Sequence, residues 1–257
     1  MPHDPDPLLL TNLSNLAALW RTLGADEVAP GLWRSRSWPY RLWWDPRRAG
    51  PTDPVDERLR LDLLAAAEDP RTLTVWSAES PPGPRADLEA TGLEVSMTQV
   101  AMDLDLTRPA HLAAPDRAPL ELLPGESDPA RWSAAASRAF GYPIEEAVFP
   151  AAAGARGLEL FRVEEAGRTL ATALALRTDL VGEPCSDGEV LGVHLVGVVP
   201  RARRRGLAAR AMDALLAHGR AGGARLATLQ ASAMGLGLYE KLGFQVRGGV
   251  ATWRARG

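Results

Sequence analysis

The chain has 257 residues, of which 46% are hydrophobic and 24% are charged, and its formal net charge is −3. These values are typical of a folded globular protein with room for one large domain or two ordinary ones. The slightly acidic balance argues against nucleic acid as the main partner, because binding to a phosphate backbone favours a basic domain.

The first half begins with an acidic segment, residues 1–7, which lacks the basic start of a secretory signal. No apolar run reaches the length of a membrane span, so we expect a cytoplasmic protein without a membrane partner. Apolar residues recur at helical spacing over 8–23, between Pro7 and Gly24, which suit the start and the end of a helix. Further elements expected in this half are strands at 33–44, 72–77 and 93–106 and helices at 55–68 and 85–91.

A proline-containing linker is predicted at 107–118, directly before Pro119, because this stretch has no apolar periodicity. Six of the eight tryptophans precede it, so the first half should have its own aromatic core or pocket wall. We therefore predict a smaller, Trp-rich α/β domain at 1–106 and a second domain at 119–257.

Strands and helices alternate in the second domain, but several strands meet in hairpins, which favours an α/β fold with a mixed sheet. The single cysteine, Cys185, lies in an acidic turn and is expected to be a loop thiol; one cysteine excludes a disulfide, and we expect no metal site. Strands are expected at 120–123, 158–164, 169–177, 189–199, 226–230 and 244–254, and helices at 129–140, 144–153, 203–218 and 233–242.

A basic turn between a strand and a helix, VVPRARRRGLAAR at residues 198–210, predicts an anion site. The first amides of a helix lack partners and carry partial positive charge, so a phosphate binds well there. Gly206 lets the backbone approach the ligand, and Arg203, Arg204 and Arg205 can pair with phosphate oxygens. The alternative is a solvated, Arg-rich first turn. The spacing is neither that of a Walker loop nor that of a dinucleotide-binding fingerprint.

A second motif, LYEKLGF at residues 238–244, places Tyr239 on a short helix that Gly243 ends before a strand. This arrangement delivers a phenol beside the sheet, although the same apolar residues could simply be helix core. Taken together, the two motifs resemble those of the GNAT (GCN5-related) N-acetyltransferase superfamily, over the part from about Leu120 to the end of the chain. The resemblance implies a central mixed sheet flanked by helices, with acetyl-CoA bound where the strands at 193–199 and 226–230 splay apart.

The resemblance also implies which residues hold acetyl-CoA. The backbone of Val196 and Val198 would pair with the pantetheine arm, and the amides of 204–209 would hold the pyrophosphate. Ser232 stands where members of the family often have an asparagine, so that contact is a departure from the pattern. The full set of expected cofactor-binding residues is Val196, Gly197, Val198, Arg203, Arg204, Arg205, Gly206, Leu207, Ala208, Ala209, Ser232 and Tyr239.

For the chemistry, Tyr239 matches the position of the acid that protonates the leaving thiolate in the family, and a backbone amide near Val198 would polarise the thioester carbonyl. His194 is the favoured base, because alternation along the strand places it on the same face as Val196 and Val198. The alternative is a core histidine. Glu189, near the strand start, is the second candidate base.

The first half carries a fainter resemblance to the same fold, in LEATGL at 88–93 followed by a strand that ends in MDLDL at 102–106. It is interpreted either as a degenerate second copy in a tandem GNAT protein or as a simple extension. The aromatic residues at 38, 40, 43 and 44 could wall an acceptor site, or they could form the core of this half.

The function expected from these features is acetyl-CoA-dependent N-acetylation of a primary amine of a small molecule. Alternatives are acetylation of a peptide or protein amine, and a catalytically weak CoA-binding sensor or structural module. The expected partners are acetyl-CoA and the amine, without nucleic acid. The protein could be a monomer or a homodimer.

Overall fold

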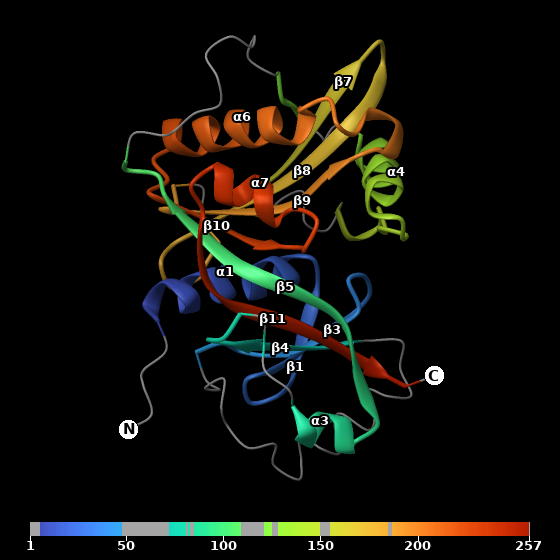
Figure 1. Ribbon diagram of the computed structural model, residues 1–257, viewed down its shortest axis with the longest axis vertical. Coiled ribbons are helices and arrows are strands. Elements are labelled where there is room, and N and C mark those ends of the chain that lie inside the picture. The colour runs from blue at the N-terminus through green and yellow to red at the C-terminus, as the bar shows by residue number, and fades with distance from the viewer. Residues whose placement is uncertain are drawn as a thin grey trace.

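The computed structural model describes residues 6–47, 72–80, 82, 85–108, 121–124, 128–149, 155–184 and 187–256. Within these ranges, eleven strands form one sheet in the order β1-β2-β3-β4-β11-β5-β10-β9-β8-β7-β6 (Figure 1). The strands are β1 Ala25–Ala29, β2 Leu32–Ser35, β3 Arg41–Trp44, β4 Thr72–Ser77, β5 Leu93–Asp105, β6 Leu123–Pro124, β7 Leu158–Glu165, β8 Arg168–Thr178, β9 Val190–Val198, β10 Leu226–Ala231 and β11 Gln245–Ala255. The helices are α1 Pro7–Thr22, α3 Ala86–Ala90, α4 Pro129–Phe140, α6 Leu207–Ala221 and α7 Leu236–Lys241, with a 3₁₀ turn, η1, at Pro200–Ala202.

The sheet is mixed, as expected from the hairpins in the sequence. Among the described strands, β3 pairs with β4 and β9 pairs with β10 in parallel, and the other pairs are antiparallel. Helices flank this sheet, which confirms the predicted fold class. None of the described helices combines the length and the apolar character needed to cross a membrane.

The two halves of the chain share this sheet through their last strands. β5, from the first half, lies between β10 and β11, and β11 in turn lies between β4 and β5. The two halves are therefore continuous in the sheet, a connection that the division into 1–106 and 119–257 did not anticipate. The linker at 107–118 stays a prediction, because residues 109–120 lie outside the described residues.

Each half also repeats the same order of elements. β1, β2 and β3 pair antiparallel in succession, β3 and β4 pair in parallel, and the short helix α3 precedes the long strand β5. In the second half, β7, β8 and β9 pair antiparallel, β9 and β10 pair in parallel, and α7 precedes β11.

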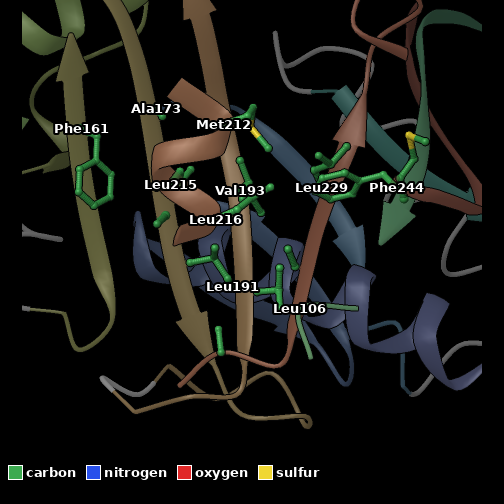
Figure 2. Close-up of a cluster of buried hydrophobic side chains, with 14 of the residues drawn as sticks. Leu106, Phe161, Ala173, Leu191, Val193, Met212, Leu215, Leu216, Leu229 and Phe244 are labelled. Atoms are coloured by element: carbon green, nitrogen blue, oxygen red, sulfur yellow. The ribbon is translucent and has the colours of Figure 1, made fainter. Parts of the chain in front are cut away.

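Alternation along the strands separates two faces of the sheet. Ala173 and Ala175 of β8 pack into the core beneath α6, with Met212 and Leu215 (Figure 2). Leu174 and Leu176 face the other way, toward residues of α1 and α4. We call these the α6 face and the α1 face.

Helix α1 covers strands of the second half, although it belongs to the first. It begins where the predicted helix does, with Asp6 capping the amide of Leu8 at 2.9 Å. It packs on β5, β8, β9, β10 and β11. Its apolar spacing is as predicted, but the polar residues between the leucines are buried too, and Asn12 donates to the carbonyls of Met102 and Leu229 at 2.8 and 3.2 Å.

Other predicted elements are found with shifted ends. The stretch 33–44 holds most of β2 and all of β3, and the helix expected at 203–218 begins only at Leu207, after η1. The helix expected at 233–242 begins at Leu236. The helix at 55–68 and the loop thiol Cys185 lie outside the described residues, as does the end of the helix suggested at 144–153.

Candidate active site

β9 and β10 diverge after a short parallel pairing. They pair only between Val190–Gly192 and Leu226–Thr228, after which β9 continues to Val198 and β10 to Ala231. The outer edge of β9 is paired with β8, and that of β10 with β5. The inner edges beyond Gly192 and Thr228 therefore face one another without a ladder between them, and Figures 1 and 2 show the two strands separating. This separation agrees with the splay that the family resemblance implies.

A β-bulge lies in β9 at the start of this open edge. The register with β8 shifts between Thr172↔Gly197 and Leu174↔His194, so β9 carries one extra residue there, and Leu195 has a left-handed φ of 49°. His194 and Leu195 are consecutive but both lie on the α1 face, whereas Val193 and Val196 pack on the α6 face. The bulge thus reverses the alternation within the strand.

The predicted shared face of His194, Val196 and Val198 is therefore wrong. Val198 packs with Ala211 of α6, while His194 points to α1, because the extra residue inverts the pattern of alternation. His194 is 6% exposed, and its Nε2 lies 2.9 Å from Oδ1 of Asn15.

The hydrogen bonds of Asn15 determine which nitrogen of His194 carries the proton. The amide nitrogen of Asn15 donates to the carbonyl of Leu176 and to Oγ1 of Thr178, at 3.1 and 3.0 Å. Its oxygen is then the acceptor, so His194 Nε2 must be protonated. Burial lowers the pKa of His194 to about 3, and the imidazole is therefore neutral at ordinary pH and a weak base. This geometry favours the core histidine over the catalytic base.

Glu189 lies at the closed end of the strand pair. Its carbonyl accepts from the amides of Arg225 and Leu226, and its carboxylate lies 3.3 Å from the Arg225 guanidinium. Leu195 lies six positions further along the chain, a span of roughly 20 Å at the usual rise per residue. The structure does not bring Glu189 to the splay, which argues against the second candidate base.

The basic turn forms the connection from the open end of β9 to α6 (Figure 1). Arg204 and Gly206 adopt left-handed φ angles of 59° and 73°, and the helix begins at Leu207. The first bond into the helix runs from the amide of Arg210 to the carbonyl of Gly206 at 3.1 Å. The preceding amides of the first turn, at 207–209, have no acceptor within the helix and remain available to an anion.

The three arginines of the turn differ in their contacts. Arg203 donates to the carbonyls of Ala139 and Val198, at 2.8 and 3.2 Å. Arg205 forms a bidentate pair with Glu165, at 3.1 and 2.8 Å. Arg204 is exposed and, among the described residues, has no ion-pair partner. Arg203 and Arg205 are thus already engaged, and Arg204 is the arginine best placed to reach a phosphate.

Tyr239 lies on α7, against the α6 face. Its ring packs edge-on against Phe244, with centroids 5.8 Å apart. Burial raises the pKa of Tyr239 to about 12, so the phenol stays protonated at ordinary pH. Ser232 is exposed, and its carbonyl accepts from the amides of Gly235 and Leu236, at 2.9 and 3.0 Å, where α7 begins.

Gly197 is required by close packing beneath the splay. A Cβ at this position would lie 2.8 Å from atoms of both Ala139 and Phe140. The strand therefore approaches the end of α4 more closely than any side chain would allow.

Two contributions from the first half were not predicted. Asn15 holds His194, and Arg41 of β3 lies partly buried beside the aromatic residues expected to form a pocket wall or a core. The sequence does mark Arg41 as unusual, because it is a charged residue directly before the apolar run LWW, in a strand that was expected to form the core.

Comparison with known proteins identifies relatives by sequence pattern and by fold. Residues 127–244 match the model of the acetyltransferase (GNAT) family. The fold is similar to that of a GNAT-family acetyltransferase from Novosphingobium aromaticivorans DSM 12444, with 20% identity, a TM-score of 0.61, and coverage of 98% of this chain and 100% of the other. A GCN5-related N-acetyltransferase from Kribbella flavida has 19% identity and a TM-score of 0.62, with 96% of each chain covered.

A GCN5-related N-acetyltransferase from Sphaerobacter thermophilus has 18% identity and a TM-score of 0.54, with 87% of this chain and 76% of the other covered. At these identities the likeness shows the fold, and its coverage extends over the first half. No curated protein matched the sequence significantly.

Proposed function

We propose that this enzyme transfers the acetyl group of acetyl-CoA to a primary amine of a small molecule, because residues 127–244 match the model of the acetyltransferase (GNAT) family. The observation that carries the proposal is the open edge of β9, which leads directly to the unpaired amides at the start of α6. A thioester arm fits a free strand edge, and a diphosphate fits a helix start.

In this mechanism the free edge of β9 supplies an amide for the thioester carbonyl. The amide of Val199 donates to Leu170 of β8 at 2.9 Å, so the amide of Val198 points to the opposite side, toward the open edge. There it can stabilise the negative charge that develops on the carbonyl oxygen.

Tyr239 is the proposed acid. The amine nitrogen forms a bond to the carbonyl carbon, the carbon–sulfur bond breaks, and the thiolate takes the phenolic proton of Tyr239. The nitrogen loses its second proton as it becomes an amide, and this proton returns through solvent to the Tyr239 phenolate. Because His194 is a neutral, buried imidazole and Glu189 is remote, we propose that the proton of the incoming ammonium leaves to solvent. The contribution of the protein to that step is orientation of the amine.

The same facts favour one alternative, a catalytically weak CoA-binding module. No described histidine or carboxylate has been assigned as a base at the splay, and Ser232 replaces the amide side chain that is common in the family. Such a module would bind acetyl-CoA but would release no thiol in the presence of amines.

We also propose that the first half is a degenerate GNAT copy, supported by the repeated order of strands and by their pairing directions. Further proposals are a cytoplasmic location and action as a monomer or homodimer, without a nucleic-acid partner. The net charge of −3 supports the last point.

The test combines binding and turnover. Acetyl-CoA should raise the melting temperature, because it binds only the folded state, and thiol release should depend on an added amine. Gly206→Val should abolish the rise in melting temperature. Gly223→Val is the matched control, since Gly223 also has a left-handed φ, of 91°, but lies at the other end of α6. Equal responses of the two variants would contradict the phosphate site, and binding without thiol release would favour the module.

A further inference from the structure

We propose that a pocket beside the basic turn is a second anion site, which binds an organic phosphate monoester through Arg168 and Arg201. Both arginines are exposed, and both line the pocket. The site does not depend on the proposed acetyl transfer, because it lies on the other side of β9 from the splay.

The pocket has a volume of about 340 Å³ and lies between the tip of the β7–β8 hairpin and the segment that connects β9 to α6. Its floor is apolar, because the buried residues Leu170 and Ala202 pack together there. β8 pairs with one edge of β9 and β10 with the other, so β9 separates the pocket from the splay. The exposed residues of the lining are Glu165, Ala166, Arg168, Arg201 and Arg205.

The charged side chains of the pocket leave an excess of two positive charges. Arg205 donates two hydrogen bonds to Glu165, and these lower the pKa of Glu165, so its carboxylate stays ionised and neutralises Arg205. No Asp or Glu in the described part of the chain forms an ion pair with Arg168 or Arg201. Two free guanidinium groups match a phosphate monoester, which carries about −1.5 to −2 charges at pH 7. Their planar N–H edges bind phosphate oxygens in pairs.

Both walls of the pocket are fixed by contacts within the protein. In the hairpin, Glu165 pairs with Arg168 across a two-residue turn, in which Ala166 and Gly167 have left-handed φ angles of 48° and 71°. Arg131 of α4 donates to the carbonyl of Gly167 and holds this turn from the other side. The opposite wall, η1, is anchored in the apolar cluster that forms the floor. A site that is fixed in advance loses little entropy when a ligand binds.

The volume and the floor favour an organic monoester over inorganic phosphate. Pockets for small organic ligands measure about 300–1,000 Å³ and combine apolar walls with a few polar groups. The organic group of a monoester can cover Leu170 and Ala202 while its phosphate lies between Arg168 and Arg201. Two sources carry this chemistry: a free phosphate monoester, and acetyl-CoA itself, whose ribose bears one.

The binding test uses phenyl phosphate, titrated by NMR in the presence of saturating acetyl-dephospho-CoA. This acetyl-CoA analogue has the diphosphate but no monoester, so it fills the helix start and leaves the pocket open. Phenyl phosphate should bind about tenfold more tightly than benzenesulfonate, which has the same ring but a single charge, and more tightly than inorganic phosphate.

The variants remove or add positive charge at the pocket. Arg168→Gln combined with Arg201→Gln should weaken phenyl phosphate binding about tenfold or more. The matched control combines Arg34→Gln with Arg256→Gln, which removes the same charge at exposed positions of the strand β2 and of the chain end, and should change the affinity less than about twofold. Glu165→Gln should instead strengthen binding severalfold, because it removes the negative charge and frees Arg205.

Comparison of acetyl-CoA with acetyl-dephospho-CoA separates the two sources. If the double pocket variant weakens acetyl-CoA but not the analogue, the bound monoester is that of acetyl-CoA; if it weakens only phenyl phosphate, the ligand is a separate molecule. The inference is overturned if this variant and its control bind phenyl phosphate equally and show the same preference for acetyl-CoA over the analogue. Failure of both acetyl thioesters to bind, while phenyl phosphate still distinguishes the variant from its control, would contradict the proposed transferase activity and leave the pocket as an anion site.

Discussion

Lowering the pH should destabilise this protein through His194. The pKa of His194 is about 3 in the folded protein, below its ordinary value of 6.5, so the unfolded chain binds a proton that the folded one excludes. The contribution of the neutral, buried His194 to the free energy of unfolding is complete above pH 6.5 and is lost as the pH falls toward 3. Between pH 8 and pH 5, this one group should reduce the free energy of unfolding by about 2 kcal/mol.

The assay is urea unfolding of the wild type and of His194→Gln at pH 8, 7, 6 and 5. Glutamine can still donate to Asn15 but does not titrate. Between pH 8 and pH 5, the free energy of unfolding of the variant should therefore fall by about 2 kcal/mol less than that of the wild type. His218→Gln, which replaces an exposed histidine bound to Glu159, should retain that decrease. Parallel pH curves for the wild type and His194→Gln would refute the reasoning. So would an imidazole resonance of His194 that titrates near pH 6.5, and this result would restore the residue as a candidate base.

Four further substitutions test the site and the packing around it. Tyr239→Phe should lower kcat by about a hundredfold with little change in acetyl-CoA affinity, measured by thiol release and calorimetry; a loss confined to affinity would contradict the acid role. Arg204→Gln should weaken acetyl-CoA binding about tenfold. Arg205→Gln should change it less than about threefold, because Arg205 is already paired with Glu165. The reverse order of effects would show that this ion pair opens for the ligand. Gly192→Ala should cost about 2 kcal/mol or more in urea unfolding, because its Cβ would lie 1.7 Å from Oδ1 of Asn15, and an unchanged midpoint would mean that α1 can shift away.

The features that sequence could predict are those encoded by neighbouring residues. The helix near 8–23, the β9–turn–α6 segment and the short helix with Tyr239 follow from periodicity, capping and glycine positions, and all are present. The splay followed from the family resemblance, and the strand pairing agrees with it.

The features that sequence could not predict depend on distant contacts. Leu195 takes a left-handed φ that no leucine signals, and this single residue turned His194 away from the expected face. Arg203 and Arg205 looked equivalent to Arg204, but carbonyls at Ala139 and Val198 and the carboxylate of Glu165 engage them. Such partners are selected by tertiary structure and leave no local pattern.

The position of β5 has a consequence for how the chain reaches this structure. Both neighbours of β5 are synthesised more than a hundred residues later, since it pairs with β10 at Leu226–Ala231 and with β11 at Gln245–Ala255. During translation the first half must therefore emerge with unsatisfied strand edges on β4 and β5, which are sites for aggregation. Folding should be slow, because the central ladder closes only when the last strand arrives, and a chaperone that shields these edges would increase the yield of active enzyme.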